Sequence, residues 1–168
     1  AAVFAAAAAG SFGSVAEATF RGETGWVVKS SNNTKDKCST EMIDKEILVL
    51  RDMQGVRGFP VLRAVVRDGD TVRLVIQRLP YTLAQLTHIA PLPLEDVCRI
   101  AVQTIDALEA LHDKWWVHRD IKPDNTMLDD RAGLVYLIDF GLAKRIIDEK
   151  GAHIPDLHTK RISGTPRY

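Results

Sequence analysis

Two short polar segments in the second half of the chain carry side chains that could do chemistry together. The first spans residues 118–125 (HRDIKPDN), and the second, Asp139-Phe140-Gly141, begins fourteen residues after Asn125. A carboxylate can accept a hydroxyl proton, an ammonium group can stabilise a phosphoryl group in transfer, and carboxylate and amide oxygens bind magnesium. Either segment alone is compatible with an ordinary polar turn. Both together, in this order and at this spacing, favour phosphoryl-transfer chemistry.

These segments resemble the catalytic loop and the metal-binding triplet of eukaryotic-type protein kinases. The resemblance implies that Asp120 is the base or orienting carboxylate and that Lys122 faces the γ-phosphate of ATP. It also implies that Asn125 and Asp139 hold Mg²⁺, and that the acceptors are serine or threonine hydroxyl groups of protein substrates. His118 would order the site by packing rather than transfer protons.

A glycine-rich segment near the start of the chain resembles the phosphate-binding loop of kinases, because small residues let backbone amides approach phosphate oxygens. It consists of Gly10, Ser11, Phe12, Gly13, Ser14 and Val15. A dinucleotide site is disfavoured, since we expect a strand after these glycines and that site needs a helix. The family's first glycine would fall at Ala8, within the alanine-rich residues 1–9. We interpret this run as a placeholder for unassigned side chains, with a real strand or helix as the alternative.

Lys29 ends an expected apolar strand, at the position where the resembling kinases present their ATP-positioning lysine. Glu46 lies on the apolar face of the next expected helix, where a carboxylate is costly unless it is paired. We therefore predict an ion pair between Lys29 and Glu46. Glu41, near the start of the same helix, is the alternative partner.

The resemblance also implies an adenine-binding site. Ile76 would lie at its back, and the backbone groups of Gln77 and Leu79 would hydrogen-bond the base. The apolar residues assigned to the two faces of the base are Val15, Val27 and Met127. Apolar residues of this kind belong to the core of any fold, so these assignments depend on the resemblance alone.

Four segments favour the casein kinase 1 group of kinases: residues 134–139, 141–144, 153–155 and 163–168. Thr165 resembles the family threonine that hydrogen-bonds the catalytic aspartate and lysine. Pro166 departs from the family, which usually has a small residue there. Arg119 has few obvious acceptors in the following loop, so activation by loop phosphorylation is not indicated.

Relatives in this group prefer serine or threonine preceded by acidic or phosphorylated residues. Lys160, Arg161 and Arg167 could form the matching anion pocket, because clusters of arginine and lysine bind phosphate groups. A solvated basic cluster is the alternative interpretation.

Composition limits the function classes. The 168 residues are 46% hydrophobic and 26% charged, which is typical of a globular protein. Lys plus Arg and Asp plus Glu number 22 each, so no overall charge attracts nucleic acid. We expect no membrane insertion. Cys38 and Cys98 lack disulfide or metal-site spacing, which favours a cytoplasmic or nuclear location.

The pattern of elements predicts an α+β fold, and the resemblance implies the two-lobe fold of a protein kinase. Residues 1–79 would form an ATP-binding lobe of antiparallel strands with one helix, over residues 40–53. Residues 80–168 would form the first part of a mostly helical lobe, truncated, with a helix over residues 94–112, two short strands and a long loop from residue 142. The alternative to an active kinase is a pseudokinase or a structural component of a larger assembly.

Overall fold

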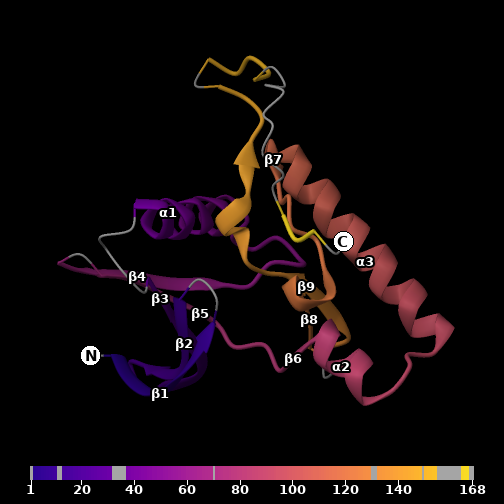
Figure 1. Cartoon of the computed structure of the whole chain (residues 1–168), viewed down its shortest axis with the longest axis horizontal. Coiled ribbons are helices and arrows are strands. Elements are labelled where there is room, and N and C mark those ends of the chain that lie inside the picture. The colour runs from indigo at the N-terminus through magenta and orange to yellow at the C-terminus, as the bar shows by residue number, and fades with distance from the viewer. Residues whose placement is uncertain are drawn as a thin grey trace. The chain divides into compact units, whose positions relative to one another are not determined.

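The computed structural model describes residues 2–10, 13–31, 37–69, 71–129, 132–148, 150–154 and 164–166. The chain divides into two compact units, shown in Figure 1. The first contains Ala1–Gly55 and Pro60–Leu79, and the second contains Val56–Phe59 and Pro80–Tyr168.

The first unit is built on a five-stranded antiparallel sheet with the order β1-β2-β3-β5-β4. Its strands are β1 (Ala2–Gly10), β2 (Gly13–Phe20), β3 (Glu23–Ser30), β4 (Leu62–Asp68) and β5 (Thr71–Gln77). The turn between β2 and β3 has positive φ at both central residues, 52° at Arg21 and 86° at Gly22. Two successive residues with positive φ match the right-handed twist of a hairpin.

Helix α1 (Lys37–Asp52) is the helix of the first unit and contacts β4 and β5. Its buried residues recur at helical spacing: Ile43, Glu46, Ile47, Val49 and Leu50, followed by Met53 just after the helix. Val72 and Leu74 of β5 are also buried, whereas Val75 belongs to a separate cluster with Ala18 and Val28. Helix α1 packs against β4 and β5 of the sheet that contains β3, and β3 and α1 carry Lys29 and Glu46.

The second unit contains α2 (Leu83–Ile89), α3 (Leu94–Asp113), short 3-10 turns at η1 (Pro123–Asn125) and η2 (Phe140–Leu142), and two small sheets. The first sheet has the order β6-β8-β9, with β6 (Tyr81–Thr82), β8 (Thr126–Asp129) and β9 (Leu134–Leu137). The second pairs β7 (Trp116–Val117) with β10 (Lys144–Arg145). The expected α+β fold, with antiparallel strands and one helix in the first unit, is confirmed.

Two features of the second unit differ from the sequence-based expectation. Helix α2 was not predicted, although Thr82 and Gln85 form a capping box at its start. The expected loop from residue 142 contains β10, and Asp148 Oδ1 accepts the N–H groups of Lys150 and Ala152, both at 2.9 Å. A long-range pairing with β7 therefore orders a segment that has no periodicity of its own.

The segment Val56–Phe59, expected within the first lobe, packs in the second unit. The N–H of Leu137 donates to the carbonyl of Gly58 at 2.9 Å, and the Phe59 ring stacks on Phe140 with centroids 5.7 Å apart. Gly58 has φ +92°, and a Cβ there would lie 2.8 Å from Ala107 Cβ. Glycine thus permits the close approach of this segment to α3.

Candidate active site

The first unit brings Lys29 and Glu46 together. Lys29 Nζ lies 2.6 Å from Glu46 Oε2, and their side chains are 16% and 4% exposed. Glu41, the alternative partner, is exposed. Because Glu46 is on the buried face of α1 and Lys29 is on a central strand, the ion pair ties the helix to the sheet.

The glycine-rich segment closes the hairpin between β1 and β2, where Gly10 is paired with Gly13. Ser11 and Phe12 lie outside the described residues. Val15, the last residue of this predicted loop, is in β2 and is 38% exposed.

The residues predicted to bind adenine are distributed over both units. Val27 and Ile76 are paired on neighbouring strands of the first unit, and Met127 is in β8 of the second. The N–H of Gln77 already donates to the carbonyl of Val61 at 2.9 Å, so it is not available to a base. The adenine-binding roles of the Gln77 carbonyl and of Leu79, which is buried, remain predictions.

In the second unit, His118 is a buried residue at the start of the predicted catalytic loop, residues 118–125. Its side chain is 1% exposed, its Nε2 lies 3.0 Å from the carbonyl oxygen of Ile138, and its Nδ1 accepts the N–H of Asp120 at 3.3 Å. The ring also lies 5.0 Å from that of Phe140, centroid to centroid. Burial lowers the pKa of His118 below its usual 6.5, although the Ile138 carbonyl and nearby carboxylates oppose the shift. His118 is therefore a neutral spacer that holds the backbone of Asp120.

The depressed pKa of His118 predicts a loss of stability in mild acid. As the pH falls below about 6.5, the unfolded chain takes up a proton on this side chain before the folded chain does, so the free energy of unfolding decreases. Urea unfolding at pH 7.5 and pH 5.5 measures this decrease. The decrease should be smaller in His118→Gln and unchanged in His88→Gln, since His88 is exposed. An equal decrease in His118→Gln and in the parent protein would contradict the prediction.

Asp120 is held by three side chains. Its Oδ1 accepts the hydroxyl of Thr165 at 2.7 Å, and its Oδ2 accepts Nδ2 of Asn125 at 2.9 Å and lies 2.9 Å from Nζ of Lys122. Lys122 Nζ also donates to Thr165 Oγ1 at 2.7 Å, which closes a ring of contacts. Four predicted site residues are thus joined by direct contacts: Asp120, Lys122, Asn125 and Thr165.

The carboxyl group of Asp120 is ionised at neutral pH. Burial alone would raise the pKa of Asp120, but hydrogen bonds from Thr165, Lys122 and Asn125 outweigh burial and hold the pKa below its usual value. A carboxylate with a low pKa is a weak base and a good hydrogen-bond acceptor. This environment suits the orientation of a hydroxyl group better than the removal of its proton.

The oxygen ligands near the catalytic loop fit magnesium. Asn125 uses Nδ2 to bind Asp120, and no described residue donates a hydrogen bond to its Oδ1. The backbone N–H of Ile138 donates to the backbone carbonyl of Asn125 at 3.1 Å. Because Ile138 directly precedes Asp139, this bond brings Asn125 and Asp139, the two predicted metal-binding residues, close in the structure. Within the described ranges, no group of three His, Cys, Asp or Glu residues could hold a metal alone. One carboxylate and one amide oxygen match a magnesium ion that takes its other ligands from phosphate and water.

The catalytic loop also contacts both ends of the segment from Leu142 to Gly164. Arg119 Nε donates to the carbonyl of Leu142 at 2.7 Å, and a Cβ on Gly164 would lie 2.7 Å from the carbonyl oxygen of Arg119. Neither contact was predicted from the sequence. The acceptor of Arg119 is a backbone carbonyl, which no residue type indicates, and the glycine directly before Thr165 was the available signal for the second contact.

Replacing Gly164 with alanine should displace Thr165. Gly164 has φ +106°, so the new side chain adds backbone strain to the clash with Arg119. We expect a cost of about 1–3 kcal/mol and a fall in kcat of about tenfold or more. Gly151→Ala is the matched control, since Gly151 has φ +77° but nothing within 4 Å of the added Cβ. Steady-state kinetics that give equal losses for both variants would show that strain alone is responsible.

The predicted anion pocket lies outside the described residues, which exclude Lys160, Arg161 and Arg167. Its role therefore stays a prediction.

A family model of the protein kinase domain matches residues 7–168 of the chain. The chain belongs to the protein kinase family. The match includes every site residue predicted above, from the glycine-rich segment to Thr165, and both units of this kinase. Among the described residues, none of the helices combines the length and apolar character needed to cross a bilayer.

Proposed function

We propose that this kinase transfers the γ-phosphoryl group of ATP to serine or threonine hydroxyls of protein substrates, with Mg²⁺ as cofactor. The observation that carries the proposal is the contact of Thr165 with both Asp120 and Lys122. These hydrogen bonds join Thr165 to the catalytic loop. They also fix the position of the Asp120 carboxylate, which would meet the substrate hydroxyl.

The hydrogen-bond capacity of Asp120 supports this role. An ionised carboxylate has about four acceptor positions. Thr165 uses one on Oδ1, whereas Asn125 and Lys122 both bind Oδ2. Among the described residues, one position on Oδ1 is thus left for a substrate hydroxyl. Because phosphoryl transfer passes through a loose transition state, orienting this hydroxyl contributes more than strong basicity does.

Lys122 provides the positive charge for the transferring group. The Lys122 side chain is 17% exposed, and its ammonium group is held by Thr165 and Asp120, so it is positioned before the substrate binds. A preorganised cation of this kind stabilises charge that develops on the phosphoryl oxygens.

For the nucleotide, we propose that Lys29 binds the phosphates and that Asn125 and Asp139 hold Mg²⁺. When bound, the metal neutralises charge on the phosphates. The contribution of Glu46 is to orient the ammonium of Lys29, since their ion pair is nearly buried.

The casein kinase 1 group is the branch that we propose, on the resemblance of residues 134–139, 141–144, 153–155 and 163–168. This branch implies a preference for acidic or phosphorylated substrates, with Lys160, Arg161 and Arg167 as the anion-binding residues.

We also propose a cytoplasmic or nuclear location. A pseudokinase or assembly role is the alternative, and the presence of Lys29, Asp120, Asn125 and Asp139 disfavours it.

The test is a phosphotransfer assay on the full-length protein with labelled ATP. Casein, a serine peptide with acidic residues before the serine, the same peptide with tyrosine in place of serine, and a panel of small molecules serve as acceptors. We expect label on casein and on the serine peptide only. Asp139→Asn is the control, because it removes the carboxylate proposed to hold the metal. Equal incorporation by Asp139→Asn and by the parent protein, or none by the parent protein, would refute the proposal.

A further inference from the structure

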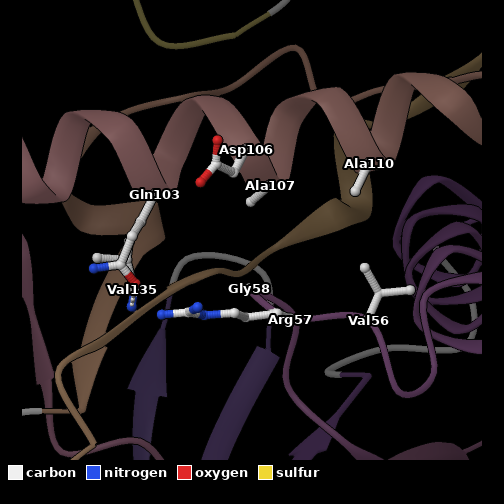
Figure 2. Close-up of a pocket in the computed structure, with 8 residues that line it drawn as sticks. All are labelled: Val56, Arg57, Gly58, Gln103, Asp106, Ala107, Ala110 and Val135. Carbon is white, nitrogen blue, oxygen red and sulfur yellow. Dashed lines mark hydrogen bonds between the residues drawn. The ribbon is translucent and has the colours of Figure 1, made fainter.

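A small pocket in the second unit lies apart from the residues proposed for catalysis. It has a volume of about 180 Å³ and is formed by the Val56–Phe59 segment, α3 and β9. Figure 2 shows its lining, of which Val56, Ala107, Ala110 and Val135 are the apolar side chains. Sites for cofactors and drug-sized ligands usually measure about 300–1,000 Å³. The smaller volume suits an aliphatic side chain better than a cofactor.

The floor of the pocket is rigid. Gly58 approaches Ala107 so closely that an added Cβ would lie 2.8 Å from the alanine Cβ. Both polar atoms of the Gln103 side chain make hydrogen bonds inside the protein, because its Nε2 donates to the carbonyl of Gly133 at 3.1 Å and its Oε1 accepts the N–H of Val135 at 3.2 Å. A preformed floor costs little to bind, because no loop has to be ordered there.

Two opposite charges line the same pocket. Figure 2 shows Asp106 on the side of α3 and the Arg57 side chain extended along the opposite wall. Both residues are exposed, and the interactions of the described residues include no hydrogen bond or ion pair for either side chain.

Five of the other arginines in the described ranges form ion pairs with carboxylates, whereas Arg21, Arg51, Arg119 and Arg145 do not. The pairs are Arg63 with Glu23, Arg67 with Asp44, Arg73 with Asp68, Arg78 with Glu17 and Arg99 with Glu95. Arg57 differs from these five, since the carboxylate of the same pocket, Asp106, is not paired with it. The two charges are therefore available to a ligand that carries both signs.

We propose that this pocket is a docking site for an extended peptide of a partner protein. An aliphatic side chain of the peptide fills the space between Val56, Ala107 and Ala110. An acidic residue on one side of it pairs with Arg57, and a basic residue on the other side pairs with Asp106. Docking of this kind adds a contact remote from the phosphoryl-transfer residues, and it contributes to the choice of partner rather than to the chemical step.

The test uses fluorescein-labelled peptides and the full-length protein, with anisotropy as the readout. The probe has the core Glu-Leu-Lys between glycines, and the comparison peptides carry Gly in place of Leu or exchange Glu and Lys. We expect saturable binding of one order of charges and weaker binding of the Gly peptide. Arg57→Gln and Asp106→Asn should each weaken binding about two- to fivefold, as exposed ion pairs do. The double variant Arg57→Asp/Asp106→Arg should reverse the preference between the two orders of charges.

Ala110→Trp fills the pocket and should weaken binding at least about tenfold. Ala101→Trp is the matched control, since Ala101 is an exposed residue of the same helix that does not line the pocket. Circular dichroism and phosphorylation of a short peptide without the docking core should be the same in both variants. No saturable binding at about millimolar peptide, or an equal loss in Ala101→Trp, would overturn the proposal.

Discussion

Replacing Asp120 with asparagine should lower kcat for protein phosphorylation by about 10²- to 10⁴-fold. An amide has one acceptor oxygen, so it cannot serve Thr165, Asn125, Lys122 and a substrate hydroxyl together. The variant also loses the negative charge that holds the ammonium of Lys122, 2.9 Å from Oδ2. Steady-state kinetics with labelled ATP and casein measure the change.

Asp124→Asn is the matched control for this prediction. Asp124 lies in the same loop and makes the same change of charge, but it is exposed. Its kcat should stay within about threefold of the parent value, since exposed charges contribute little at physiological salt. A similar loss in both variants would assign the effect to the charge of the loop. Activity near the parent level in Asp120→Asn would remove the proposed role of Asp120.

Replacing Lys29 with methionine should reduce both activity and stability strongly. Glu46 is 4% exposed and would lose the ammonium that lies 2.6 Å away. Removing one member of a buried ion pair costs about 3–5 kcal/mol, because the remaining charge stays in a poorly solvated environment. We expect phosphotransfer near background and an unfolding transition at lower urea concentration.

Two further variants separate the two effects of Lys29. The double variant Lys29→Met/Glu46→Leu should recover most of the stability but no activity, because an apolar pair can replace a buried ion pair in packing but not in binding phosphate. Arg67→Met removes the ion pair between Arg67 and Asp44, which lies on α1 like Glu46. This pair is equally short, 2.6 Å, but exposed. The substitution should change the free energy of unfolding by less than about 1 kcal/mol. Activity in the double variant would contradict the proposed role of Lys29.

The ion pair and the catalytic loop were predictable because local rules apply to them. A carboxylate on the apolar face of an amphipathic helix demands a cation, and Lys29 was the nearest candidate on an apolar strand. The reactive groups of residues 118–125 lie on one short segment of the sequence, so their proximity could be predicted without knowledge of the fold. The periodicity of residues 94–112 likewise indicated α3.

Other contacts join residues that are distant in the sequence, and no local pattern marks them. Thr165 reaches Asp120 across 45 positions, a contact that the sequence suggested only through resemblance to kinases. The partner of Arg119 is a backbone carbonyl, which every residue has, so no residue type points to Leu142. The availability of Arg57 and Asp106 to a ligand likewise depends on where their side chains lie in the pocket.

The amino-acid sequence alone determined the reactive groups, the hairpins and the amphipathic helices, because hydrophobic periodicity and turn residues act over a few positions. Only the tertiary structure decided that Val56–Phe59 belongs to the second unit, that β10 pairs with β7, and that Asn125 and Lys122 share one oxygen of Asp120 while Thr165 binds the other. These outcomes depend on steric fit and hydrogen bonding between distant segments. Such complementarity arises when the chain packs, and the pattern of any one segment does not contain it.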